Sequence, residues 1–195
     1  MAYLTKQERY EEILHLATMI AREEGLSAIT ARNIATKGQI AVGQVHHHFQ
    51  SISQLKAMAL ETISKALLKQ NDVMLKEMTL LDQLIQLLCP YEEGDIGNTM
   101  RRLWSESQFL AEQDAEIKKA YKQSIDDWYQ QILQLVKEGV QQGCFHIQSA
   151  SETTWMLIAV SCGFDSLSVV EDFRVNRQLI RRHIAQILQV DGKAT

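Results

Sequence analysis

"TARNIATKGQIAVGQVHHHFQSISQL", residues 30–55, decides the fold of this chain, because it predicts two short helices joined by a tight turn. Thr30 can cap the first of them, since its hydroxyl can accept a hydrogen bond from a backbone N–H group that the first turn leaves free. The same helix turns Ile34 and Ala35 towards its neighbours. The run "TKGQ" then ends it, so the chain changes direction within a few residues.

The second short helix begins near Ala41 and places Val42 or Val45, and then Phe49, against the helices before it. A longer helix, "KQERYEEILHLATMIAREEG" at residues 6–25, precedes both, and its apolar residues recur at three- and four-residue spacing. Two short helices and a tight turn after a longer supporting helix are typical of a helix-turn-helix. The sequence therefore predicts a DNA-binding motif in its first quarter.

Three consecutive histidines, His46, His47 and His48, lie in the second short helix and raise the question of a metal site. Adjacent residues of an α-helix point about 100° apart, so the three rings spread around the helix axis and cannot share one ion. Zinc sites on helices need partners three or four residues apart. We therefore predict no metal site. Two interpretations stay open: ordinary surface histidines, or rings that donate N–H hydrogen bonds to DNA phosphates.

The remainder of the chain is also predicted to be helical, so the fold class is all-α. The 195 residues include one proline and nine glycines, and no run of alternating apolar residues is long enough to require a sheet. The segment "WMLIAV", residues 155–160, is apolar all round, so its helix should be buried on more than one side. The further helices are expected at residues 53–70, 80–88, 98–112, 114–142, 151–169 and 174–189.

The composition of the chain limits its possible cellular locations and binding partners. No segment has the apolar length of a membrane span, and the first residues, "MAYLTKQERYEE", lack the apolar stretch of a signal peptide, so we expect a cytoplasmic protein and no membrane partner. The net charge is −4, but the basic and acidic residues of positions 1–50 balance, so the acidity lies in the remainder. That asymmetry has the sign expected for a DNA-binding front end.

The sequence gives little support for an enzymatic function. The sequence has no G-x-S-x-G, no phosphate-binding glycine loop and no zinc-ligand spacing. Its cysteines, Cys89, Cys144 and Cys162, lie far apart, and we expect reduced thiols. We therefore expect no catalytic residues, no cofactor and no enzymatic activity.

Eight residues of the helix-turn-helix region stand where one family's pattern has its fixed positions: Thr30, Ile34, Ala35, Ile40, Gly43, Val45, Phe49 and Leu55. With them, the chain resembles the tetracycline-repressor (TetR/AcrR) family of transcriptional regulators. The helices that follow are similar to the bodies of that family, so the resemblance covers essentially the full length. It implies a helix-turn-helix DNA-binding domain at residues 1–52 and a helical effector-binding and dimerisation domain at residues 53–195.

The resemblance also implies which residues meet DNA. Gln44 and Val42 would face base edges, where a glutamine can bridge adenine N6 and N7 and an apolar side chain can contact a thymine methyl group. His46 and His48 stand where the family usually has tyrosines, one of which contacts phosphate. The DNA-binding set implied in this way is Thr30, Arg32, Ala41, Val42, Gln44, His46, His47 and His48.

Two departures from the family pattern concern the strength of DNA binding. Gln39 stands where the turn usually has glycine, so a left-handed backbone there would cost about 1 kcal/mol, unless the turn shifts by one residue. Ile52 replaces a lysine that touches the DNA backbone, and its absence should weaken binding and lower the salt slope by about one unit. These residues keep a second hypothesis open, a helical dimeric protein-interaction module with a weakened DNA-binding head.

The family likeness further implies a homodimer that leaves a palindromic double-stranded operator when a small molecule binds. Most members of the family repress transcription, so a repressor is the expected role. The helices at 151–169 and 174–189 would form the dimer interface. The effector pocket would be lined by inward-facing aromatic or sulfur-containing residues, and plain core packing is the alternative for each: Met100, Trp104, Phe109, Tyr121, Trp128 and Met156.

Overall fold

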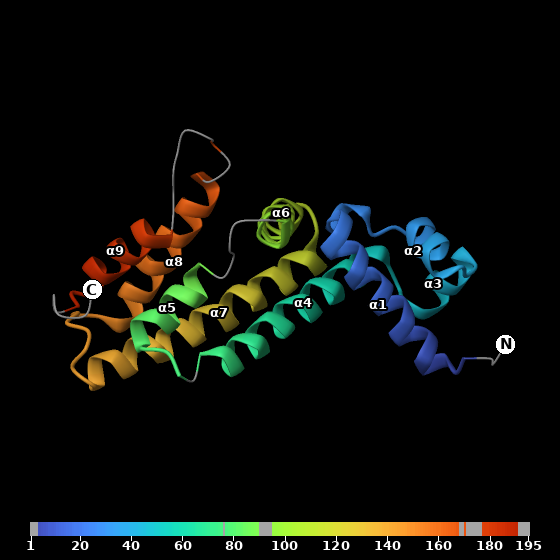
Figure 1. Cartoon of the computed structure of the whole chain (residues 1–195). Helices are drawn as coiled ribbons and strands as arrows, with labels where there is room; N and C mark the ends of the chain where they lie inside the picture. Colours follow the sequence, from blue (N-terminus) through green and yellow to red (C-terminus); the bar gives the residue numbers. More distant parts are fainter. Residues whose placement is uncertain (1–3, 76, 90–94, 168–169, 171–176, 191–195) are drawn as a thin grey trace. The chain divides into compact units, whose positions relative to one another are not determined.

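The computed structural model describes residues 4–75, 77–89, 95–167, 170 and 177–190 of the chain. All regular structure within these ranges is helical, so the predicted all-α fold is confirmed. No helix of this described part is long and apolar enough to cross a membrane. The elements, shown in Figure 1, are α1 (Lys6–Glu24), the 3₁₀ helix η1 (Leu26–Ala28), α2 (Ala31–Gly38), α3 (Val42–His48), α4 (Ile52–Met74), α5 (Leu80–Leu88), α6 (Asp95–Ala111), α7 (Ala115–Gln141), α8 (Ala150–Leu167) and α9 (Arg177–Ile187).

The chain divides into two compact units. Unit 1 consists of Met1–Leu67 and Glu93–Ile125, and unit 2 consists of Leu68–Glu92 and Asp126–Thr195. Helices α4 and α7 each contribute residues to both units. The assignment of a DNA-binding domain to residues 1–52 and an effector-binding domain to residues 53–195 stays a prediction.

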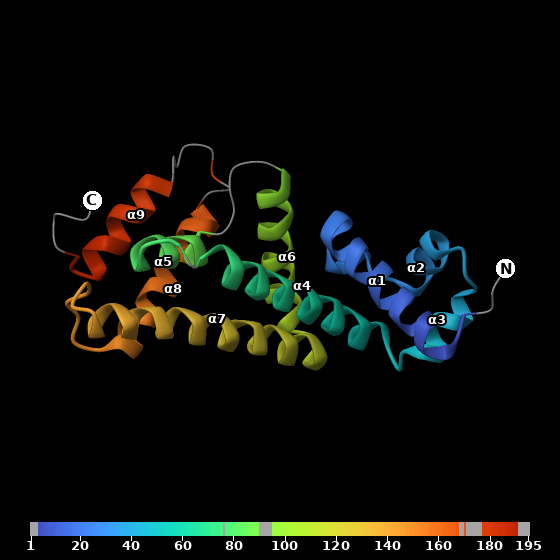
Figure 2. The ribbon, with the colours of Figure 1, turned by 60° about the horizontal axis from the view of Figure 1, so that its bottom comes forward.

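The first three helices of unit 1 form the predicted helix-turn-helix arrangement, and they lie together in both ribbon views (Figures 1 and 2). Thr30 caps α2 as predicted, because its hydroxyl accepts a hydrogen bond from the Asn33 backbone N–H at 3.1 Å. Thr5 and Glu8 cap the start of α1 with a reciprocal pair of hydrogen bonds. The interior between the helices is apolar, and each of its main side chains is at most 6% exposed: Ile13, Ala17, Ile20, Ile34, Ala35, Val45 and Phe49.

Helix α6 belongs to unit 1 and contacts the end of α1. The guanidinium of Arg102 donates to the Glu23 carbonyl oxygen at 2.8 Å, and the Ser27 backbone N–H donates to the Glu106 carboxylate at 3.3 Å. Gly25 lies beside these contacts with φ at 98°, and a Cβ atom placed on it would be 2.5 Å from the Glu106 carboxylate. A larger residue at position 25 would therefore meet both a strained backbone and an occupied space.

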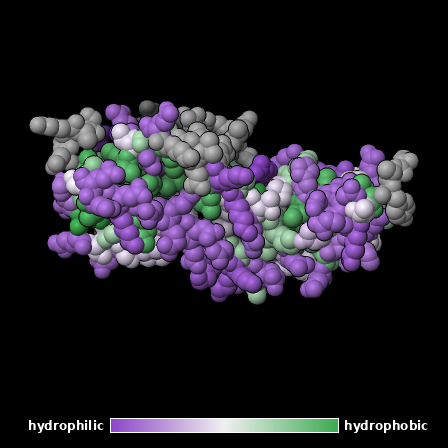
Figure 3. Space-filling model, turned by 90° about the horizontal axis from the view of Figure 1, so that it is seen from below, coloured by the Kyte–Doolittle hydropathy of each residue, from purple (hydrophilic) through white to green (hydrophobic). Residues whose placement is uncertain are grey.

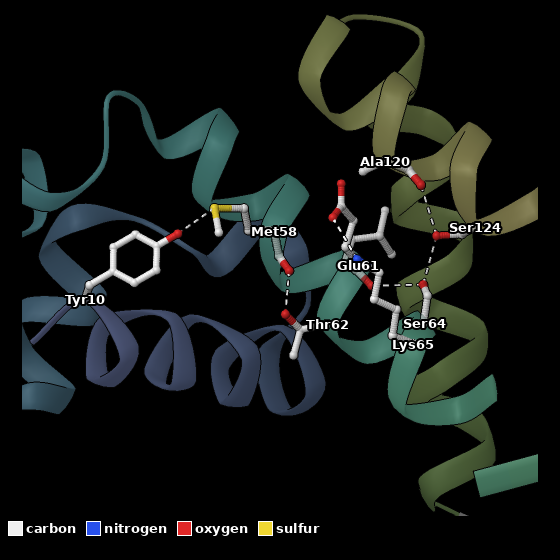
Figure 4. Close-up of polar contacts among 9 residues, drawn as sticks. Tyr10, Met58, Glu61, Thr62, Ser64, Lys65, Ala120 and Ser124 are labelled. Carbon is white, nitrogen blue, oxygen red and sulfur yellow. Dashed lines mark hydrogen bonds and ion pairs between the residues drawn. The ribbon is translucent and has the colours of Figure 1, made fainter. Parts of the chain in front are cut away.

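Hydroxyl groups join α4 to α7 within unit 1. The Oγ atoms of Ser64 and Ser124 are buried and lie 2.9 Å apart (Figure 4). At the start of α4, the Ser53 hydroxyl donates to the Asp114 carboxylate and lies 2.6 and 2.5 Å from its two oxygens. Asp114 also accepts the Ile117 backbone N–H at 3.2 Å and so caps α7. These bonds, with the Ser53 bond as the largest cause, hold the pKa of Asp114 below its usual range.

Unit 2 has an apolar core of its own, formed by α5, the later part of α7, α8 and α9. The indole N–H of Trp128 donates to the Leu87 carbonyl oxygen at 3.0 Å, which joins α7 to α5. Arg181 of α9 pairs with Asp82 of α5. The most deeply buried side chains of this core are Leu84, Ile85, Ile132, Val136, Leu157, Ile184 and Leu188.

Helix α8 differs from the prediction for "WMLIAV", because the single chain buries only one of its sides. Leu157 and Ile158 are buried, but Trp155 and Met156 are 48% and 53% exposed. Tyr129 of α7 stacks on the Trp155 ring with centroids 4.6 Å apart. Figure 3 shows hydrophobic side chains on the visible surface of unit 2. An apolar helix therefore keeps large hydrophobic side chains at the surface of the single chain.

The last two helices are described over shorter ranges than predicted. Helix α8 is described to Leu167, and α9 begins at Arg177. Positions 168, 169 and 174–176 of the predicted helices lie outside the described residues.

Candidate nucleic-acid interface

Helix α3 turns one side chain into the interior and the others outward. Val45 is 1% exposed and Val42 is 44% exposed, so Val45 is the valine that packs against the neighbouring helices. The sequence pattern alone is compatible with either valine in this role. The predicted DNA-contact residues that are exposed here are Ala41, Val42, Gln44, His46 and His47. They form an outward surface that could reach the edges of bases.

Two of the three histidines touch at the end of α3. The rings of His47 and His48 meet edge to face, with centroids 5.2 Å apart. Burial lowers the pKa of His48, and the positive charges of His47, Lys6 and Arg9 lower it further. His48 therefore holds a proton less readily than an ordinary histidine. Among the described residues, no group of three or more His, Cys, Asp or Glu side chains is placed to hold a metal ion.

The first turns of α1 lie beside the end of α3. The Tyr10 ring stacks on Phe49 with centroids 4.6 Å apart, and its hydroxyl donates to the Met58 sulfur at 3.4 Å (Figure 4). Lys6 lies one helical turn before Tyr10 and therefore on the same side of α1. Sequence reasoning missed this basic group beside His48, because only a tertiary contact brings α1 to α3. The spacing of Lys6, Arg9 and Tyr10 along one helix face is the signal that could have indicated it.

The predicted contact residues of α2 are both exposed, namely Thr30 and Arg32. The Thr30 oxygen accepts the capping bond, and a hydroxyl in that role can still donate its proton elsewhere. Lys37 behaves differently, because its ammonium lies 2.8 Å from Glu23 and 2.6 Å from Glu24. The hydrogen bonds to these two carboxylates raise the pKa of Lys37. Its charge is therefore balanced within the chain.

The six residues predicted to line an effector pocket are divided between the two units. In unit 1, Met100 is buried, and the rings of Trp104 and Tyr121 meet at a steep angle with centroids 6.3 Å apart. In unit 2, Trp128 is half-buried. The inward orientation predicted for Phe109 and Met156 is wrong, because they are 60% and 53% exposed.

The geometry of the helices explains both exposed side chains. On α6, Ser107 is fully buried and Phe109 follows it by two residues, which is about 200° around the axis. On α8, Met156 precedes the buried Ile158 by two residues and so also points to nearly the opposite side of its helix. Apolar character alone did not reveal which face of each helix is turned inward.

A hollow of about 460 Å³ opens in unit 2 between α5 and α7, and none of the six predicted pocket residues lines it. Its polar lining on α7 recurs at spacings of three and four residues, which in sequence is typical of a solvated helix face. No signal in the sequence therefore distinguished it. The lining consists of Leu75, Gln83, Leu87, Asp127, Gln130, Gln131, Gln134 and Leu135.

Comparison with known proteins finds likeness at the level of structure. No protein-family model and no curated protein matches the chain. A TetR transcription regulator from Haloarcula marismortui is 18% identical, with a TM-score of 0.73 over 94% of this chain and 97% of that one. A TetR-family transcriptional regulator from Cytophaga hutchinsonii is 14% identical, with a TM-score of 0.74 over 96% and 97%. A Saccharomonospora viridis protein in complex with choline, itself proposed to be a transcriptional regulator, is 21% identical, with a TM-score of 0.77 over 95% and 97%.

The chain has the TetR-family fold. Sequence identities of this size establish a shared fold and no more. The predicted resemblance to the TetR/AcrR family is confirmed at that level, including the N-terminal helix-turn-helix and the helical body that follows it.

Within the TetR fold, both departures from the family pattern can be located. Gln39 has φ at 51° and ψ at 41°, so the turn keeps its place and a non-glycine residue takes the left-handed conformation. Gly38 has a different role, because a Cβ atom there would lie 2.7 Å from a methyl group of Leu16 on α1. Ile52 is the first residue of α4 and is partly buried. The apolar side chain of Ile52 therefore packs partly against the chain itself, at the position where the family pattern has a lysine that can contact DNA.

Proposed function

We propose that this chain is a DNA-binding transcriptional regulator that acts as a homodimer. The observation that carries the proposal is the outward display of Gln44 and Val42 on a helix that Val45 anchors in a helix-turn-helix core. Such a helix can enter a major groove, where Gln44 would bridge adenine N6 and N7 and Val42 would contact a thymine methyl group. In a two-fold dimer, the two α3 helices would read half-sites about 34 Å apart on palindromic double-stranded DNA.

Phosphate contacts in this proposal come from the start of α2 and from the end of α3. The start of α2 offers the Thr30 hydroxyl and the exposed cation of Arg32, and both groups suit phosphate oxygens. His46 and His48 would donate ring N–H bonds from the other end of α3, with His47 between them. These contacts would fix the register on DNA, while Gln44 and Val42 would read the sequence.

The dimer would form through α8 and α9. Support comes from α8, where Trp155 and Met156 are about half exposed in the single chain. A second copy packed on this side would remove both from water, which is the usual driving force of obligate interfaces.

We further propose that a small molecule releases the dimer from its operator, which makes the protein a repressor. The Saccharomonospora viridis protein of the same fold holds choline, which supports a ligand site in this fold. Helix α4 begins directly after the helix-turn-helix and contributes residues to both units, so it would carry the effect of the ligand to α3. Operator and effector would then weaken each other with a coupling of about 1–3 kcal/mol.

The second candidate function is a dimeric protein-interaction module with a weak DNA-binding head. One observation favours it: α3 contains no lysine or arginine, and the nearby Lys37 is held by Glu23 and Glu24. Because phosphate contacts by cations supply most non-specific DNA affinity, such a head would bind DNA weakly.

Fluorescence anisotropy distinguishes the two candidate functions. Binding of the protein to a pool of genomic fragments, which includes the region upstream of its own gene, is measured at two salt concentrations. A regulator should bind one fragment tightly, and salt should weaken that binding. Gln44→Ala should weaken it about 5- to 150-fold, the equivalent of 1–3 kcal/mol for a base contact. Gln108→Ala, at an exposed glutamine of α6, is the matched control and should leave it unchanged. A folded dimer that selects no fragment at either salt concentration would favour the interaction module.

A further inference from the structure

The hollow of unit 2 is lined by acidic, amide and apolar side chains and by no basic ones. Its wall on α7 carries one carboxylate and three amides, from Asp127, Gln130, Gln131 and Gln134. Its floor is apolar, since Leu87 and Leu75 are 2% and 7% exposed. No lysine, arginine or histidine is among the residues that line it. A ligand there would meet negative charge and polar oxygens above a hydrocarbon surface.

Two of the hydrogen bonds that the lining forms narrow the ligand further. The side-chain nitrogen of Gln83 on α5 donates to the Met78 carbonyl oxygen at 3.0 Å. The side-chain nitrogen of Gln134 donates to the Glu138 carboxylate at 2.8 Å. An amide has two N–H donors and one carbonyl acceptor, so a glutamine that commits a donor is left relatively richer in acceptor capacity. With the Asp127 carboxylate, which only accepts, the hollow favours ligands that donate.

We propose that this hollow is the effector site and that its ligand is an organic cation with N–H groups and a short apolar body, such as a primary amine or an amidine. The proposal rests on the function proposed above and names the class of its effector. The ammonium or amidinium group would donate to Asp127 and to glutamine oxygens, because hydrogen bonds between charged groups are shorter and stronger than neutral ones. The apolar body would lie on the leucine floor. A volume of about 460 Å³ is within the range of small-molecule sites.

Three small probes test the chemistry directly, by isothermal titration calorimetry on the full chain without DNA. Benzylamine has an N–H cation and an apolar ring, benzyltrimethylammonium keeps the ring and charge without N–H groups, and benzyl alcohol keeps the ring without the charge. Benzylamine should bind at least about tenfold more tightly than either of the others, which corresponds to one charge-assisted hydrogen bond. Equal binding of the two cations, or no binding of benzylamine, would overturn the proposal.

Variants test the place of binding. Asp127→Asn removes the carboxylate of the hollow and should weaken benzylamine binding about tenfold or more. Gln83→Leu tests the opposite wall on α5 and should also weaken it. The matched control is Asp126→Asn, which makes the same change one residue earlier, outside the lining, and should keep the affinity. Circular dichroism checks that each variant is folded. Loss of affinity in Asp126→Asn equal to that in Asp127→Asn would place the cation elsewhere and refute the site.

A second assay keeps this inference apart from the proposed function. Benzylamine is added to the complex of protein and selected operator fragment, and anisotropy reports release. Binding that requires Asp127 but causes no release would support the site and overturn its role as an effector site. Release that Asp127→Asn leaves unchanged would support a ligand-responsive regulator and overturn this hollow as its ligand site.

Discussion

Val42 and Val45 lie on the same seven-residue helix and differ in exposure, 44% against 1%, so replacing each by alanine gives a matched pair. Val45→Ala removes two buried hydrocarbon groups, each worth about 0.8 kcal/mol of transfer free energy. The remaining cavity adds to that loss, and the better helix propensity of alanine offsets about 0.5 kcal/mol. The expected decrease in the free energy of unfolding is about 2 kcal/mol. For Val42→Ala, half of the transfer term, about 0.8 kcal/mol, is nearly cancelled by propensity, so stability should be unchanged within about 0.5 kcal/mol.

Urea unfolding of the full chain, followed by circular dichroism at 222 nm, measures both values, and hydrogen exchange of the α3 amides reports the local opening. Val45→Ala should lower the urea midpoint and speed exchange in α3. Val42→Ala should leave both unchanged and weaken operator binding, because the side chain is turned to the groove in the proposed complex. If Val42→Ala costs as much stability as Val45→Ala, the assignment of the buried and outward sides of α3 is refuted.

Three further predictions concern other parts of the chain. Gly25→Ala should destabilise the protein by about 1–2 kcal/mol, because φ is 98° and the Glu106 carboxylate occupies the space of a Cβ atom. A Gly25→Ala variant as stable as the original protein in urea would contradict the described turn. The pKa of Asp114 is lowered, so its stabilisation is present above the ordinary carboxyl pKa and is lost as pH falls through the lowered value. Asp114→Asn should therefore flatten the acid side of a plot of melting temperature against pH, and an unchanged slope there would exclude this carboxylate as a cause. Burial raises the pKa of Cys89 to about 11, so iodoacetamide at pH 8 should alkylate the exposed Cys144 first, as mass spectrometry of timed samples would show. Equal rates at the two thiols would count against the burial of Cys89.

The helix-turn-helix could be predicted from the sequence because its signals are local. A threonine that can cap and the N–H that it accepts are three residues apart, as in Thr30 and Asn33. The periodicity of Ile13, Ala17 and Ile20 marks the buried face of α1 within two turns. Such patterns depend on the backbone of one helix and need no knowledge of distant contacts.

The surroundings of the candidate sites could not be predicted in the same way. The basic residues beside His48 are there because Tyr10 stacks on Phe49, a contact between segments far apart in the chain. The exposure of Phe109 and Met156 depends on which side of an apolar helix faces the interior, and the spacing of apolar residues did not decide this. The polar wall of the hollow resembles a solvated face until α5 is placed opposite to it.

The absence of lysine and arginine from α3 has a consequence for how such a regulator would find its target. Proteins that slide along chromosomal DNA are held there by cations against phosphates, and this hold is independent of sequence. A reading helix made of valine, glycine, glutamine and histidine adds little to this hold, so it falls to cations outside the helix, such as Arg32. With so few cations, each stay on random DNA would be short, and a larger share of the search would consist of collisions from solution.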